Sequence, residues 1–343
     1  MQEKVARFRR FAVAVLAVTL VVILWGAFVR ATGAGAGCGN HWPNCNGEVI
    51  PRNPSTKTLI EFTHRLTSGA SLVCIVVQLA WAFRLFPRRH IVRKLAATVF
   101  GLIITEALIG AGLVKFEMVA GNIAVARAYW MAAHLCNTFA LLAAILLVIE
   151  RAGRSVVGES IVAAPFAARG APSLDGVGRG LLRGLGVALV AIMLVAMSGA
   201  IVALGDTLFP ARSLAEGMAA DLSPSAHLFI RLRAVHPALA LATGVFIMVL
   251  AGLLAGKDDG RSEAGRRLRG RATIAGALAL IQLAVGFTNL VLLAPVAIQI
   301  VHLLLADLVW LALVALTADV VGLVPRAVPL ARDAQGAVGA SAR

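Results

Sequence analysis

Residues 62–83 read FTHRLTSGASLVCIVVQLAWAF, and this stretch decides the fold class. No charged residue follows Arg65 within it, and its length suits the roughly 20 predominantly apolar residues with which a helix crosses a bilayer. Backbone groups find no water partner in lipid, and the stretch lacks the alternation of a barrel strand. It is therefore predicted to be a membrane-spanning helix.

Seven further segments have the same apolar character. They cover approximately residues 11–29, 95–114, 129–149, 184–205, 234–255, 273–293 and 296–319. The sequence thus predicts an all-α integral membrane protein with eight transmembrane helices in a lipid bilayer. Hydrophobic residues make up 59% and charged residues 14% of the chain, whereas a soluble domain carries about 25% charge. The net charge is +15, but nucleic-acid binding would also require a soluble fold with a basic face. No nucleic-acid binding is therefore predicted.

Most of the 32 Lys and Arg residues lie in the N-terminus, in the loops at 84–94, 151–183 and 257–271, and in the tail. By the positive-inside rule, these parts and both termini are predicted to be cytoplasmic. The stretch ahead of the first span is too short for a transit peptide, which favours a bacterial-type plasma membrane.

The segment 151–183 is rich in Gly, Ala, Arg and Ser and is predicted to be a flexible cytoplasmic linker. It separates an N-terminal four-helix bundle at 1–150 from a C-terminal four-helix bundle at 184–325. A cytoplasmic tail at 326–343 follows the second bundle.

The two halves resemble each other in register. GAFV at 26–29 matches GAIV at 199–202, and Glu106 stands four residues before a glycine, as Gln282 does in the other half. Since each half has an even number of spans, we expect two pseudo-symmetric bundles related by a two-fold axis along the membrane normal.

Four histidines repeat between the halves, His64 and His134 in the first and His236 and His302 in the second. Each lies near the extracytoplasmic end of its span, so all four share one depth. Imidazole is a good ligand for haem iron, and helix bundles bind haem with side chains from facing helices. Each half is therefore predicted to hold one haem through two histidines. For any single histidine the alternative is a hydrogen-bonded packing role.

Glu61 precedes His64 by three residues, so both side chains lie on one helix face. The second half has Leu232-Arg233 before its histidine instead. Symmetric ligands with an asymmetric acidic group suggest that one haem is chemically processed and the other only transfers electrons. The alternative is an interfacial salt bridge with Arg65 or Arg30.

The loop at 30–57 contains Cys38 and Cys45, which lie outside any apolar segment. On the oxidising side of the membrane, with Gly, Asn and Pro between them, these cysteines can close a small disulfide loop. A metal site is less favoured, because no second Cys or His pair lies near them.

These motifs resemble the haem A synthase family, whose members convert haem O to haem A for cytochrome oxidases. The resemblance extends along almost the whole membrane region. It rests on Val29-Arg30-x-Thr32-Gly33, on Cys38 and Cys45 enclosing Trp42-Pro43, on Glu61-x-x-His64-Arg65, and on histidines that open the fourth, sixth and eighth spans. Two departures stand out. His41 replaces the acidic residue that many relatives have before Trp-Pro, and the loop around 205–227 lacks the second cysteine pair that some relatives carry.

The resemblance also implies a role for each site residue. In the first half, the substrate haem O would be bound by His64 and His134. In the second half, haem b would be bound by His236 and His302. Glu61 would act at the site of oxidation, with a Cys38–Cys45 disulfide near it. Arg30 and Arg65 are candidates for pairing with haem propionates, and the alternative for Arg30 is an ordinary interfacial arginine.

The implied reaction oxidises one porphyrin methyl group through an alcohol to a formyl group, with electrons leaving through the second haem to an unidentified electron acceptor. The haem O synthase is an expected partner, and a homo-oligomer is an open alternative to a monomer. The runner-up is a di-haem membrane cytochrome that takes electrons from a quinol, which leaves Glu61 unexplained. A third class is a two-repeat transporter whose membrane histidines carry protons. Separately, Glu106 and Asp307 are membrane carboxylates and candidates for a proton path.

Overall fold

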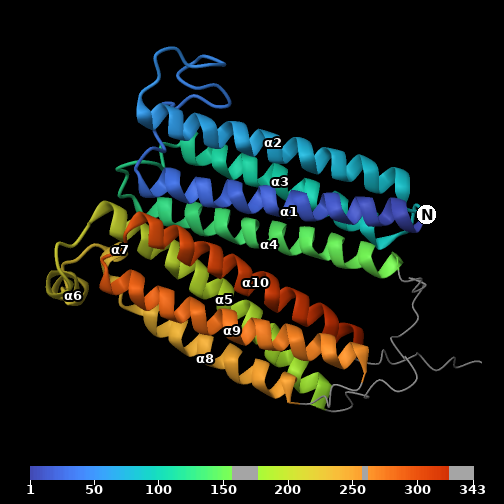
Figure 1. The fold of residues 1–343 in the computed structure, drawn as a ribbon. Helices are drawn as coiled ribbons and strands as arrows, with labels where there is room; N and C mark the ends of the chain where they lie inside the picture. The colour runs from blue at the N-terminus through green and yellow to red at the C-terminus, as the bar shows by residue number, and fades with distance from the viewer. Residues whose placement is uncertain (157–176, 257–261, 324–343) are drawn as a thin grey trace, which may run out of the picture.

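The computed structural model describes residues 1–156, 177–256 and 262–323 (Figure 1). Its helices are α1 (Gln2–Ala31), α2 (Thr56–Leu85), α3 (Ile91–Lys115), α4 (Val125–Val156), α5 (Val177–Leu208), α6 (Leu214–Leu222), α7 (Leu228–Arg231), α8 (Val235–Ala255), α9 (Glu263–Val291) and α10 (Val296–Leu323). Eight helical segments are long and apolar enough to cross a membrane, α7 and α8 together forming one of them. No strand occurs in the described residues, so the predicted all-α membrane fold is confirmed.

The predicted linker at 151–183 is partly wrong. α4 continues to Val156 and α5 already begins at Val177, so both ends of that segment are helical. Beyond the hydrocarbon the chain no longer needs apolar side chains, and Ala, Leu and Arg favour continuation of a helix. Residues 157–176 and the predicted tail at 326–343 lie outside the described residues.

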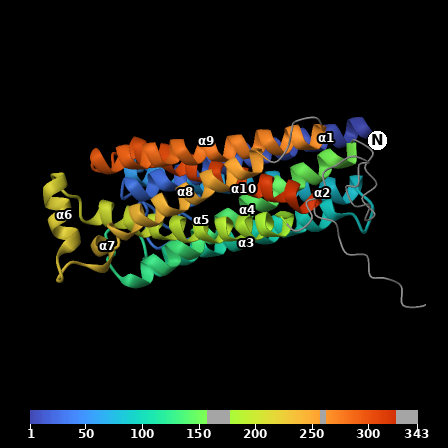
Figure 2. The same cartoon turned by 90° about the horizontal axis from the view of Figure 1, so that it is seen from below.

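The connection between α5 and α8 holds two short helices that the sequence pattern does not predict. The hydroxyl of Ser213 accepts a hydrogen bond from the N–H of Glu216 and caps α6. The imidazole of His227 caps α7 in the same way by accepting from the N–H of Phe229. Viewed from below, α6 stands across the direction of the long helices (Figure 2). We call this end of the molecule, with α6 and the 32–55 loop, the loop end, and the end near the N-terminus the opposite end.

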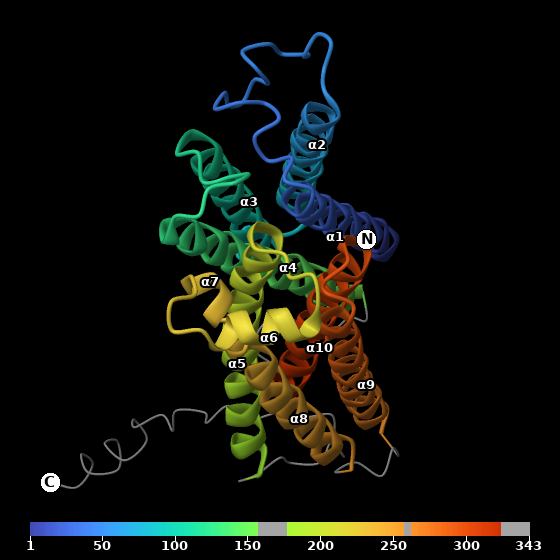
Figure 3. The same ribbon diagram turned by 90° about the vertical axis from the view of Figure 1, so that its left-hand side faces the viewer.

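Each half closes a ring of four long helices. In the first half α1 packs on α2, α2 on α3, α3 on α4 and α4 on α1. In the second half α5, α8, α9 and α10 pack on one another in the same order. Figure 3 shows the two sets separated, with α1–α4 above and the second set below. The predicted repeat thus has a counterpart in helix packing.

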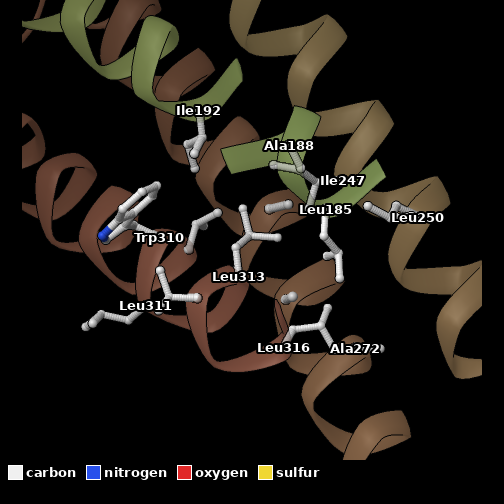
Figure 4. Packing of buried hydrophobic residues seen from close by; sticks show 14 of the residues in the cluster. Leu185, Ala188, Ile192, Ile247, Leu250, Ala272, Trp310, Leu311, Leu313 and Leu316 are labelled. Carbon is white, nitrogen blue, oxygen red and sulfur yellow. The ribbon is translucent and has the colours of Figure 1, made fainter. Parts of the chain in front are cut away.

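The halves meet through α4 and α10. α4 contacts α5 and α10, and α10 contacts α1, which is the pattern expected when a two-fold axis exchanges the halves. Indole N–H of Trp310 donates to the carbonyl of Phe139 at 2.7 Å, and the two rings stack at 4.9 Å. Trp310 belongs to a buried cluster to which all four long helices of the second half contribute apolar side chains, such as Leu185, Ile247 and Ala272 (Figure 4).

Ion pairs join the halves at the opposite end. Glu150 of α4 lies 2.6 Å from Arg267 and 2.7 Å from Arg271, both on α9. Asp319 of α10 contacts the same two arginines at 3.4 and 3.2 Å, and Arg154 of α4 at 3.2 Å. Three guanidinium groups and two carboxylates thus form one network across the contact between the halves.

We expect Glu150→Gln to destabilise the protein, because it leaves two arginines with reduced charge compensation. The carboxylate is 11% exposed and Arg267 is 44% exposed, so the loss should be about 1–2 kcal/mol rather than the larger cost of a fully buried pair. Thermal unfolding in detergent measures it. Glu3→Gln at the exposed Glu3–Arg7 pair is the control and should leave the melting temperature unchanged. Equal melting of both variants would contradict the network's role.

Candidate functional site

The four predicted haem-binding histidines lie on four different helices at the loop end. Each falls within the first ten residues of its helix, and the helices are α2, α4, α8 and α10. His64 and His134 lie on two helices of the first ring, and His236 and His302 lie on two helices of the second ring. The structure therefore places one pair of histidines in each half, as the sequence predicts.

Three of these rings lie directly against a glycine of a neighbouring helix. The pairs are Gly26 with His64, Gly199 with His236 and Gly286 with His302. A Cβ built on any of the three glycines would come within 2.9 Å of the ring carbon Cε1. These glycines therefore leave the space that the rings occupy. His134 is the exception, since the corresponding Gly110 has nothing near its side-chain position.

His134 contacts a carboxylate instead. Its Nδ1 lies 3.2 Å from Oε1 of Glu106 on α3. The hydroxyl of Thr138 also donates to that oxygen, and the amide of Asn137 donates to Oε2 at 2.5 Å. Glu106 is thus fixed by three side chains of α4.

The second half has neutral groups at its histidines. Gln282 occupies the place of Glu106 in the repeat, and its Nε2 lies 3.4 Å from Nε2 of His302. The hydroxyl of Ser198 lies 2.9 Å from Nδ1 of His236. The Nδ1 atoms of His64, His134 and His302 are buried without a hydrogen bond, and that of His134 has the ion-pair contact with Glu106 at 3.2 Å. The two histidine pairs thus share geometry and differ in the charge beside them.

Glu61 anchors the loop at 32–55 to α2. Its side chain is 4% exposed, its Oε2 accepts from the N–H of Cys38 at 2.8 Å, and its Oε1 lies 2.5 Å from Nη2 of Arg65. The expected Cys38–Cys45 disulfide is present, with both cysteines buried. The salt bridge weighed as the alternative for Glu61 is thus formed with Arg65. A carboxylate beside the first histidine pair and a disulfide loop are directly connected.

Arg65 also holds the loop at 32–55, through hydrogen bonds to its backbone. Its Nη1 donates to the carbonyls of His41 at 2.7 Å and of Asn44 at 2.6 Å. With Nη2 on Glu61, the guanidinium bridges the helix and both sides of the Trp42-Pro43 turn. The predicted propionate contact of Arg65 stays a prediction.

Arg30 joins the two halves at the loop end. Its Nη1 donates to the carbonyl of Ala203 at 2.7 Å and to the hydroxyl of Thr207 at 3.0 Å, both on α5. Its Nη2 donates to Oε1 of Gln299 on α10 at 2.8 Å. Both terminal nitrogens thus have partners in the second half, and a propionate contact of Arg30 also remains a prediction.

Two further buried charged groups lie on the helices of the histidines: Arg127, which the sequence analysis did not single out, and Asp307, which it named only as a candidate for a proton path. Arg127 of α4 is 3% exposed and stands seven residues before His134, on the same helix face. Its Nη1 donates to the carbonyls of Ala120 and Asn122, while Nε has no partner. Asp307 of α10 is fully buried with both carboxylate oxygens unpaired. A lone arginine at the end of a span gives no sequence signal of burial, since most such arginines reach the interface.

The four imidazoles do not form an ordinary metal-ion site. Within the described ranges, no three His, Cys, Asp or Glu side chains come together as ligands of a metal ion. Paired imidazoles suit an iron that brings its equatorial ligands with it, as in a porphyrin. The buried, unpaired Nδ1 atoms and the glycine-lined space around the rings fit such a group.

The chain resembles known proteins along nearly its whole membrane region. The model of the family described as cytochrome oxidase assembly protein matches residues 9–314. A protein of Thermus thermophilus named protoheme IX farnesyltransferase is 42% identical over 311 residues, which are 91% of this chain and 48% of that protein. This chain thus spans about half the length of that relative.

Shorter matches link the chain to proteins named heme A synthase. One from Alkalihalophilus pseudofirmus is 43% identical over 97 residues, 28% of this chain and 33% of the relative. One from Bacillus mycoides is 42% identical over 108 residues, 31% of this chain and 34% of the relative. With the family model covering both histidine pairs, the chain belongs to the cytochrome oxidase assembly protein family, the family of the haem A synthases.

Proposed function

We propose that the protein is a haem A synthase that oxidises a methyl group of haem O stepwise to a formyl group, giving haem A for terminal oxidases. The observation that carries the proposal is the pairing of His64 with His134 beside a carboxylate and a disulfide loop. Family membership and the matches to heme A synthases support it. The second histidine pair, without that loop, fits an electron-transfer site.

In this proposal His64 and His134 hold the iron of haem O, and His236 and His302 hold that of haem b. When bound, the iron porphyrin supplies the redox chemistry, while the protein supplies position and a site shielded from water. The glycines at 26, 199 and 286 leave the space that three of the rings occupy, since a Cβ there would clash with the imidazole. With water supplying the oxygen atom, conversion of the methyl to a formyl group releases electrons and protons, and a bound haem b would give the electrons a route to a membrane electron acceptor.

Glu61 is the residue that we propose for the chemistry of the first site. It stands one helical turn before His64 on the same face of α2, so its carboxylate borders that site. Two hydrogen-bond donors, the Cys38 N–H and Arg65, hold both of its oxygens in place. A carboxylate fixed in this way can stabilise positive charge as the methyl carbon is oxidised and can accept protons that it loses.

The substrate points to a partner. The Thermus relative carries the name of a farnesyltransferase acting on protoheme IX, and this chain matches about half of it. We propose that haem O reaches the first site from such an enzyme, the haem O synthase, within or next to the same membrane. The predicted cytoplasmic termini and extracytoplasmic histidines belong to this proposal.

A di-haem membrane cytochrome remains the second candidate, because paired histidines favour it equally. It gives no role to the Glu61–Arg65 contact or to the disulfide loop at one site only. Conversion of haem O distinguishes the two functions directly.

Glu61→Gln should keep the fold and the haem spectrum and lose conversion. An amide can still accept from Cys38, but it carries no charge, so haem A should fall by roughly a hundredfold while haem O accumulates. Extracted haems are separated by chromatography after expression in a host that makes haem O. Glu117→Gln, in the loop between α3 and α4, is the control. Normal haem A in Glu61→Gln would remove Glu61 from the chemistry.

His302→Ala should remove the second haem and leave the first. The bound haem per protein should fall to about half of the wild-type value, because iron loses one of its two axial ligands at one site only. Pyridine haemochrome analysis of purified protein measures the ratio. His90→Ala, at the N-cap of α3 outside both pairs, is the matched control. An unchanged haem content in His302→Ala would contradict the assignment.

A further inference from the structure

One carboxylate beside the histidine pairs has no role in the function proposed above. Glu106 is 17% exposed and lies within the membrane-spanning part of α3. Its Oε1 contacts Nδ1 of His134 at 3.2 Å and accepts from Thr138, while Oε2 accepts from Asn137 at 2.5 Å. The carboxylate therefore cannot swing away from the imidazole, because both oxygens are held.

The second half offers an internal comparison. Gln282 has the same place in the repeat, but its amide nitrogen lies 3.4 Å from Nε2 of His302, whereas Glu106 faces Nδ1 of His134. The Oε1 of Gln282 is buried and has no hydrogen-bond partner, so no clamp comparable with Thr138 and Asn137 holds it. The same fold thus puts a clamped carboxylate beside one histidine and a neutral, loosely held amide beside the other.

We propose that Glu106 is a positioning residue that orients His134 and strengthens it as an iron ligand. The inference rests on the proposed binding of haem by these histidines. With Nδ1 facing the carboxylate, Nε2 of His134 is left for iron. A carboxylate on the far nitrogen of a ligating imidazole fixes the ring and raises its basicity. A more basic axial ligand stabilises the ferric iron, so the haem of the first half has a lower reduction potential than the haem of the second.

This difference gives electron transfer a direction. Electrons move from the haem of lower potential to the haem of higher potential. With Glu106 in the first half and Gln282 in the second, bound haems would favour electron flow from the substrate site toward the second half. That is the direction required when the first site oxidises its substrate.

A purely structural role is the competing explanation for Glu106. The network does connect α3 to α4, and Asn137 also donates to the carbonyl of Leu102 at 2.9 Å. Glu106→Gln separates the two roles, since glutamine has nearly the same shape and can keep the hydrogen bond from Thr138. It loses the charge and the acceptor for Asn137, whose amide keeps its hydrogen bond to the carbonyl of Leu102. A structural role would be changed little by this substitution, whereas a reduction potential would respond to it.

The test is a redox titration of the purified, haem-loaded protein in detergent, followed in the visible α-bands. The wild type should show two transitions. Glu106→Gln should raise the lower potential and leave the higher one unchanged. Gln282→Glu places a carboxylate beside Nε2 of His302 and should lower the higher potential through its charge, with the lower potential unchanged. The shift also assigns each transition to its half.

Two results would overturn the inference. One is Glu106→Gln with both haems bound and both potentials as in the wild type, and the other is an equal shift of both transitions in either variant. If Glu106→Gln does not load the first haem, Gln282→Glu still tests the effect at the second site, and an unchanged potential there overturns the inference. A wild-type protein that binds no haem would instead contradict the proposed function itself.

Discussion

Lipid offers a polar group no hydrogen-bond partner, and this constraint acts on the protein at two scales. It makes every span a helix, because only a helix satisfies its own backbone groups in hydrocarbon. It also makes each membrane imidazole depend on partners inside the bundle. The rings have room there because Gly26, Gly199 and Gly286 carry no side chain where the helices approach. The close packing of the helices therefore also forms the two candidate sites.

The residue three positions before the first histidine of each pair is charged in both halves, but the charge has the opposite sign. Glu61 and Arg233 both stand three residues before a histidine, in α2 and just before α8. Glu61 is held by Arg65 and fastens the disulfide loop, whereas Arg233 is held by Asp206 and by Asp221 of α6. In each half, the residue three positions before a histidine thus forms an ion pair at the loop end. This residue is the acid in the first half and the base in the second. Duplicated helices supply the ligands, and the loop end makes the two sites chemically different.

Contacts at both ends hold the halves together. Arg30 reaches from α1 to α5 and α10 at the loop end, and the Glu150–Asp319 network joins α4 to α9 and α10 at the opposite end. Between them Trp310 stacks on Phe139. Charges of this kind are poorly solvated near a membrane and are therefore paired. Such pairing connects the helices that carry the two histidine pairs.

The sequence by itself determined the number of spans, because apolar length is a local property. It also predicted the repeat and the histidine pairs from residue spacing. It also placed Cys38 and Cys45 for a disulfide and Glu61 on the face of His64. Only the tertiary structure decided which groups meet across helices: Glu106 with His134, and Arg30 with residues of the second half. The apolar pattern also did not predict the short helix α6 or the extension of α4. That pattern reports which residues cross the lipid, whereas helices outside the lipid depend on capping residues. Spacing along one helix defines a face, but the partner of that face is set by how all eight spans pack.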